Sequence, residues 1–287
     1  MAKLLIGGEL TDSVSKETYE VRNPATGEVV DRAAKGTVKD VEQAIGAAET
    51  AFKEWSDTTP EDRGKMLTNA CELIKQKSSE IAQLLTQEQG KTLFESNLEI
   101  HHLLHGLEFY AGLASKVRGA HVPLPQKNAY GMVIRQPIGI CGGIVPWNFP
   151  LTLMGTKLGP ALTAGNTIIV KPASTTPLAT VLCLEQIQKA TYGEGKQQKT
   201  LPKGTVNVVT GPGGTVGEEL LRNPRIKRIA FTGSTAVGRR IREVTAGSGK
   251  ALTLELGGKS PYIVFDDADL DSAVEGLVDA IWFNQGQ

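Results

Sequence analysis

The sequence predicts an α/β protein built on a doubly wound parallel sheet, with a helical segment ahead of the sheet. Three observations predict this fold. Beyond residue 138, short runs rich in Ile and Val alternate with helical segments, whereas the residues before 119 show mainly helical spacing. The chain of 287 residues is 40% hydrophobic and 22% charged, an ordinary globular composition, and its length suggests roughly two domains.

The N-terminal part is expected to be helical over 37–89 and 92–115, where apolar residues recur every three or four positions. Thr59 precedes a proline and two acidic residues, a pattern typical of a helix start, and Gly90 has the position of a helix stop. The alternating stretch 130–136 lies among three prolines and is expected to be a strand in a hairpin.

The parallel sheet is expected from continuous β-branched runs, which are typical of strands covered by helices on both faces. The expected strands are 139–145, 167–171, 206–210, 228–232 and 252–256. The expected helices between them are 151–164, 177–190, 214–222 and 235–245.

The composition excludes several classes of function. With 31 basic and 31 acidic residues, the chain has no net field that would draw it to nucleic acid or to a membrane. No apolar run is long enough to span a bilayer, and the first residues lack the pattern of a signal peptide, so a cytoplasmic location is the default expectation.

The cysteines and histidines predict no metal site. The three cysteines are widely spaced, which fits neither a disulfide framework nor a zinc site, so we expect buried or half-buried thiols. They are Cys71, Cys141 and Cys183. Three histidines share one predicted helix without an acidic or cysteine set around them, so a partly exposed helix face is expected. They are His101, His102 and His105.

Chemistry is expected at the carboxyl ends of the strands, where open parallel sheets bind ligands. The nucleotide signal taken alone is weak, because no G-x-G-x-x-G follows the first strand. The small residues of 233–238 stand where a strand turns into a helix, and free N–H groups there can receive phosphate. A tight turn without a ligand fits that segment equally well. Lys171 likewise fits either a ribose contact or a solvated charge.

The motifs together closely resemble those of the aldehyde dehydrogenase superfamily, in the same order and over essentially the whole chain. The matching segments are PWNFP at 146–150, VKPAS at 170–174, FTGSTAVG at 231–238, LELGGKSP at 254–261 and FNQGQ at 283–287. The resemblance implies a Rossmann-like sheet, NAD or NADP as cofactor, and a small-molecule aldehyde as substrate. It also implies that the complete protein forms a homo-oligomer, either a dimer or a tetramer.

The resemblance also divides the chain into four parts. They are an N-terminal helical part of the cofactor domain (1–118), an oligomerisation-type β-hairpin arm (119–138), the dinucleotide-binding sheet (139–256) and the start of an incomplete catalytic domain (257–287).

Two catalytic residues follow from the resemblance, which implies oxidation of an aldehyde through a cysteine thiohemiacetal and a thioester. Asn148 matches the side-chain amide that stabilises the oxyanion, and Glu255 matches the general base for thioester hydrolysis. The plainer alternatives are a turn-forming Asn148 and a capping or surface Glu255. An acylating semialdehyde dehydrogenase is a further alternative that Glu255 disfavours.

The cofactor contacts are assigned in the same way. The resemblance places Val145, Pro146 and Trp147 at the nicotinamide, Lys171 at the ribose, Gly213 and Gly217 at the adenine and Ser234 at the pyrophosphate. The remaining contacts are Ala173, Ser174, Phe231, Thr232, Gly233, Val237, Leu256 and Gly257. Relatives that prefer NAD often carry Glu at the position of Ser174, so its serine predicts that NADP is tolerated or preferred. The polar loop 193–204 is expected near the adenine or simply at the surface.

The family's nucleophile is not among these residues. The resemblance places the catalytic cysteine about two residues beyond Gln287, and none of the three cysteines has the electropositive setting of a reactive thiol. The 287 residues alone are therefore expected to be a fragment or inactive. The alternative is a non-catalytic protein that binds a dinucleotide or pairs with another subunit through the hairpin.

Overall fold

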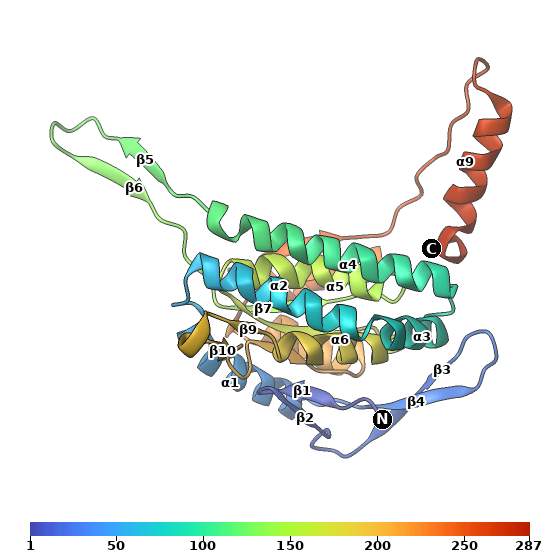
Figure 1. The fold of residues 1–287 in the computed structure, drawn as a ribbon, viewed down its shortest axis with the longest axis horizontal. Helices are drawn as coiled ribbons and strands as arrows, with labels where there is room; N and C mark the ends of the chain where they lie inside the picture. The colour runs from blue at the N-terminus through green and yellow to red at the C-terminus, as the bar shows by residue number, and fades with distance from the viewer.

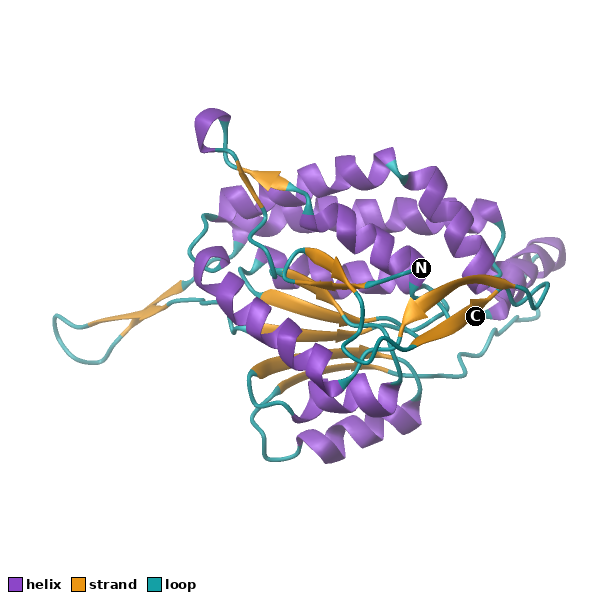
Figure 2. Ribbon diagram, turned by 90° about the horizontal axis from the view of Figure 1, so that it is seen from below, coloured by secondary structure: helices purple, strands orange, loops and turns teal.

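The computed structural model describes residues 1–287 and contains a seven-stranded sheet with helices on both faces (Figures 1 and 2). The strand order is β13-β12-β7-β8-β11-β1-β2. The five parallel strands are β7 (Ile140–Ile144), β8 (Thr167–Lys171), β11 (Val206–Val208), β12 (Ile226–Thr232) and β13 (Ala251–Glu255). The prediction of a doubly wound α/β sheet is confirmed.

The far edge of the sheet differs from the prediction. There β1 (Leu4–Ile6) and β2 (Glu9–Thr11) add two antiparallel strands, with Leu5 paired to Val208. Strands of three residues are too short to show an alternating pattern, so sequence periodicity could not reveal them. The third predicted run also ends early, because β11 stops at Val208 and not at residue 210.

The predicted helical stretch 37–89 forms three separate helices, and the stretch 92–115 forms a fourth. They are α1 (Val38–Trp55), α2 (Pro60–Gln76), α3 (Ser78–Gln89) and α4 (Leu93–Leu113). The threonines that precede α1, α2 and α4 accept hydrogen bonds from the backbone three residues later, as Thr59 was expected to do. Gly90 ends α3 in the left-handed conformation at φ 96°, which confirms its predicted role.

The helices after the hairpin cover the two faces of the sheet. They are α5 (Pro150–Thr163), α6 (Leu178–Gln188), α7 (Glu218–Arg222) and α8 (Thr235–Thr245). The predicted helical stretch 214–222 is confirmed, but its first turn, 213–217, is π-helical and α7 begins only after it. Two adjacent glycines there favour the irregular turn over an α-helix. One apolar cluster joins the sheet to α2 through α6, and a second joins the opposite face to α1, α7 and α8.

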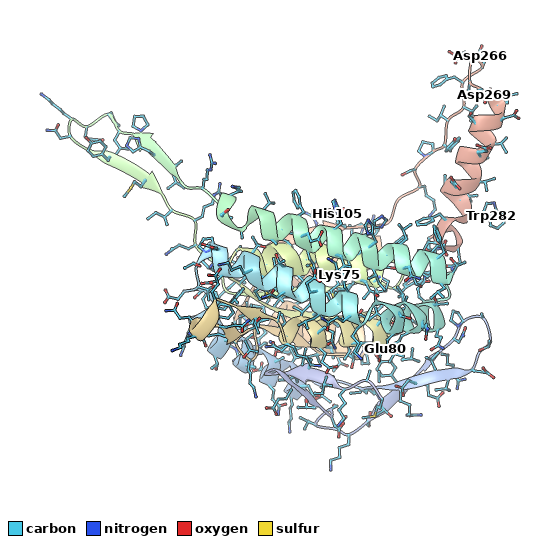
Figure 3. The ribbon with its side chains drawn as sticks, viewed as in Figure 1. Lys75, Glu80, His105, Asp266, Asp269 and Trp282 are labelled. Atoms are coloured by element: carbon cyan, nitrogen blue, oxygen red, sulfur yellow. The ribbon has the colours of Figure 1, made fainter.

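Three segments project from this body in Figure 1, one of them with its base packed against α6 through Val21 and Ala33. The hairpin of β5 (Ala120–Pro123) and β6 (Tyr130–Val133) projects at one side, and β6 ends three residues short of the predicted strand. A second hairpin joins β3 (Thr18–Arg22) to β4 (Val29–Ala34). Helix α9 (Leu270–Trp282) buries none of its residues. Figure 3 shows Trp282 pointing from α9 into open space.

The three cysteines are buried free thiols, as expected. The three histidines lie exposed on α4, and Figure 3 shows His105 on the side of α4 away from the sheet. The loop 193–204 carries the short strand β10 (Lys199–Thr200), which pairs with β9 (Thr191–Tyr192) just before the loop, and it leads to the amino end of β11. It therefore lies at the edge opposite to the expected nucleotide site. None of the helices is both long and apolar enough to cross a membrane.

Candidate active site

The register of the parallel strands brings the expected site residues to one edge of the sheet. Ile144 pairs with Lys171 on one side and with Phe231 on the other, and Thr232 pairs with Glu255. Val145 to Asn148 follow β7, and Leu256 with Gly257 follow β13. Gly213 and Gly217 lie in the turn after β11. The carboxyl ends of the strands therefore gather the whole predicted set.

The turn from β12 into α8 exposes backbone N–H groups of the kind that bind anions. The side chain of Ser234 caps α8 by accepting a hydrogen bond from the Val237 N–H at 3.3 Å. The Gly233 N–H donates to the Glu255 carbonyl at 3.0 Å, which fixes the turn against β13. Ser234 and Val237 are exposed, so the free N–H groups of the first helical turn are open to a phosphate.

A close contact explains the glycine at position 238. A Cβ there would lie 2.4 Å from Cδ2 of Leu256, so a larger residue would require the exposed leucine side chain that follows β13 to move.

Lys171 places an ammonium group at the carboxyl end of β8. Its side chain is buried, and its ammonium makes a single hydrogen bond, to the Pro172 carbonyl at 2.8 Å. Burial lowers the pKa of Lys171 to about 8. An ammonium has three donors, so two remain for a ligand such as a ribose hydroxyl. A Cβ added to Gly217 would lie 3.7 Å from Cδ of Lys171, which places the π-helical turn beside this group.

Ser174 lies near the same place and faces solvent. Its hydroxyl donates to the Gly211 carbonyl at 3.1 Å, and Ala173 beside it is half-buried. Together with Lys171 and the start of α8, this edge offers hydroxyl, ammonium and backbone N–H groups. That donor set fits the ribose and phosphate groups of a dinucleotide.

Asn148 stands at the entrance of α5, half-buried, after the exposed Trp147. Its Oδ1 accepts from the Phe149 N–H at 3.0 Å, which turns Nδ2 outward as a donor. That Nδ2 donates to the Gln287 carbonyl oxygen at 3.2 Å. The side-chain amide is therefore held by its own backbone and can reach an acceptor oxygen.

Glu255 is exposed at the end of β13 and borders a cavity of about 490 Å³ that sequence reasoning missed. The cavity also contains Lys157 of α5, which donates to Thr232 Oγ1 at 2.7 Å. Burial lowers the pKa of Lys157 to about 8, and the Glu255 carboxylate opposes that shift. The sequence signal for Lys157 was a charged residue placed among the buried apolar positions of α5, beside Met154 and Leu158.

The three cysteines have the properties of structural thiols. Burial raises the pKa of Cys71 to about 12 and that of Cys141 to about 11, and it raises the pKa of Cys183 still further. Cys141 borders the same cavity as Glu255, but its raised pKa leaves little thiolate near neutral pH. None of the three has the setting of a nucleophile.

A ring of polar residues beneath Asn148 was also missed. The carbonyl oxygen of Asn148 accepts from Lys91 Nζ at 3.0 Å and from Asn284 Nδ2 at 3.0 Å. Lys91 pairs with Glu99, and both side chains are fully buried. The sequence signal for Glu99 was a charged residue placed among the buried positions of α4, next to Ile100.

Comparisons with known proteins give consistent matches. The model of the aldehyde dehydrogenase family matches residues 10–287. The mitochondrial succinate-semialdehyde dehydrogenase of Arabidopsis thaliana is 42% identical, over 99% of this chain and 52% of that protein. The Escherichia coli K12 succinate-semialdehyde dehydrogenase with the qualifier NADP(+) is 40% identical, over 99% of this chain and 57% of that protein.

Solved structures agree. The crystal structure of succinate-semialdehyde dehydrogenase from Burkholderia pseudomallei covers 100% of this chain and 58% of that one, with TM-score 0.94 and 40% identity. A structure titled PnpE in complex with nicotinamide adenine dinucleotide gives the same TM-score of 0.94 at 40% identity, over 100% of this chain and 57% of that one. The chain spans about half the length of the curated relatives it matches.

Proposed function

The chain belongs to the aldehyde dehydrogenase family, and from this membership we propose that it carries the cofactor site and two catalytic groups of an NAD(P)-dependent aldehyde dehydrogenase. The observation that carries the proposal is the shared strand edge, where a dinucleotide-type donor set lies with Asn148 and Glu255. A bound nicotinamide would supply the hydride acceptor.

Asn148 is proposed to stabilise the oxyanion that forms when a nucleophile attacks the aldehyde. Its Nδ2 already donates to a carbonyl oxygen at 3.2 Å, and an amide donates without titrating. Removing one such donor typically lowers kcat by about 10² to 10³-fold. Asn148→Ala is therefore expected to lose about that factor, with Asn97→Ala on the exposed face of α4 as the matched control.

Glu255 is proposed to act as the general base that activates water against the thioester. Its exposure lets the carboxylate move, and Lys157 lies close enough for the Glu255 charge to oppose the lowering of the lysine's pKa. Glu255→Gln is expected to leave a first turnover of cofactor reduction but to slow the steady state. Glu243→Gln, on the exposed surface of α8, is the control.

The nucleophile is proposed to be a cysteine that follows Gln287 in the complete reading frame. Two observations support this: Cys71, Cys141 and Cys183 are buried with raised pKa values, and the relatives are nearly twice as long. The 287 residues alone would then bind the cofactor without oxidising aldehydes. Turnover by those residues that is lost in Cys141→Ser would contradict the proposal.

The substrate class is proposed to be a small aliphatic semialdehyde. Several relatives at 39 to 42% identity are named succinate- or glutarate-semialdehyde dehydrogenase, and others in that range are named betaine aldehyde dehydrogenase or simply aldehyde dehydrogenase. The test is a panel of aldehydes given to the complete protein, with NAD(P)H formation followed by absorbance. A preference for a non-carboxylated aldehyde would contradict the substrate class, and no oxidation of any aldehyde would contradict the proposed function itself.

The β5–β6 hairpin is proposed to contact a second subunit. It exposes Tyr130 by 80%, Met132 by 76% and the following Ile134 by 74%, and its strand edges are open to pairing. Replacement of Met132 and Ile134 by Lys is expected to lower the molecular mass found by light scattering. An unchanged oligomer would contradict the assignment.

A further inference from the structure

We propose that the buried Lys91–Glu99 pair is a positioning device for Asn148, an inference that rests on the proposed oxyanion role of that residue. Lys91 lies in the turn between α3 and α4, and Glu99 lies on α4. Neither residue belongs to the strand edge that holds the rest of the site. Both are positioning residues, because they reach the substrate only through the residues that they hold.

Lys91 holds the backbone at Asn148 from one side. Its ammonium is fully buried, pairs with Glu99 Oε2 and donates to the Asn148 carbonyl oxygen at 3.0 Å. The same ammonium lies 4.3 Å from the centre of the Phe149 ring, within the range of a cation–π contact. One charged group therefore fixes two consecutive residues of the loop before α5.

Glu99 holds the next residues. Its Oε1 accepts from the Leu151 N–H at 2.7 Å and from the Thr152 N–H at 3.1 Å, in the first turn of α5. Phe149, the residue before that helix, makes no side-chain cap of its own. The carboxylate from α4 thus replaces the missing cap and fixes the start of α5.

A second helix shows that capping alone does not require a lysine. Glu88 accepts from the Leu178 N–H at 2.7 Å and from the Ala179 N–H at 2.9 Å, at the start of α6. It is also buried, yet no lysine or arginine pairs with it. At both sites a buried carboxyl group accepts from two backbone N–H groups at a helix start, but only the site at α5 adds a lysine that also bonds to Asn148.

The energetics favour the same interpretation. Burying an ion pair loses hydration that the pairing recovers only in part, so a buried pair is weak evidence for stability. Its effect is to fix geometry. Because the Asn148 carbonyl is held by Lys91 and also by Asn284 Nδ2 at 3.0 Å, the direction of the Asn148 side chain is set before any ligand binds.

The test uses the complete enzyme and the double variant Lys91→Met/Glu99→Gln. The glutamine oxygen at 99 can still accept from Leu151 and Thr152, so the helix start keeps its cap while the bond to Asn148 is lost. We expect kcat for aldehyde oxidation to fall about 10-fold with an unchanged Kd for the cofactor. In an Asn148→Ala background the same double change is expected to have no further effect.

Three further variants separate positioning from folding. Glu99→Gln alone keeps the Lys91 bond to Asn148 and should lose less of kcat than Lys91→Met/Glu99→Gln. Lys91→Gln/Glu99→Gln places an amide donor at position 91 and should recover part of the loss, and it also serves if the methionine variant does not fold. Glu88→Gln is the matched control, because it replaces the other buried capping carboxyl group without touching Asn148.

Two results would overturn the inference alone. One is an active enzyme whose kcat is unchanged in Lys91→Met/Glu99→Gln. The other is a loss of kcat that multiplies with that of Asn148→Ala, since independent effects add in free energy. A wild-type enzyme that binds the cofactor but oxidises no aldehyde would overturn the proposed function and this inference together.

Discussion

Replacing Ser174 with Glu should turn the cofactor site against NADP. Ser174 is exposed beside Lys171, at the place proposed for the adenosine ribose. Two unit charges 4 Å apart repel by about 1 kcal/mol in water and by about 4 kcal/mol at a dielectric constant of 20. Because the position faces solvent, we expect about 2 kcal/mol against a 2′-phosphate, which is about a 30-fold weaker Kd.

The assay is calorimetric titration of wild type, Ser174→Glu and Ser174→Gln with each cofactor. The glutamine variant has the same size without the charge, so it isolates the electrostatic part. Binding of NAD should be unchanged or up to about 10-fold tighter in the glutamate variant, because a carboxylate accepts from both ribose hydroxyls. Added salt should reduce the difference in Kd between NAD and NADP in the glutamate variant. Equal losses for NAD and NADP in both variants would refute the assignment of Ser174.

Two further predictions concern stability. Burial raises the pKa of Glu88 from 4.5 to about 8, so between those values the folded chain holds a proton that the unfolded chain has released. The free energy of unfolding should therefore fall by a few kcal/mol as pH rises from about 4.5 to about 8, and Glu88→Gln should flatten that slope in urea titrations. Gly36→Ala should destabilise the fold by about 1 to 3 kcal/mol, because a Cβ there would lie 2.4 Å from the Thr210 carbonyl oxygen. Gly46→Ala, in α1 with nothing within 4 Å, should stabilise it by about 0.5 to 1 kcal/mol, and a cost equal to that of Gly36→Ala in thermal melts would contradict the reasoning.

Most of the fold could be predicted because its signals are local. β8 begins and ends at the predicted residues, and α8 runs from Thr235 to Thr245 as expected. In both, the hydrophobic period and the flanking residues agree, as with Ser234 at the start of α8. Where the pattern is short, as in β1, the structure depends on pairing with β11, about 200 residues away in the chain.

The carboxyl ends of the strands, where the cofactor is proposed to bind, could be located from the sequence for a related reason. Parallel strands place their carboxyl ends together, so residues that follow five separate strands must share one edge whatever their separation in sequence. That rule alone predicts that Asn148, Lys171 and Glu255 lie on the same side of the sheet. It does not predict what lies beneath them, because α4 and α5 pack through contacts between distant positions.

Buried charges mark the limit of the sequence argument. The sequence pattern predicts apolar side chains at the positions of Glu99 and Lys157 and an ordinary turn at Lys91. At each position the sequence shows a charged residue instead, and all three are buried. A departure of this kind shows that a charge is buried, but its partner has to be found in space. Lys91 shows why: its ammonium joins a carboxylate eight residues ahead to the Asn148 carbonyl 57 residues ahead, and only the folded structure brings these groups together.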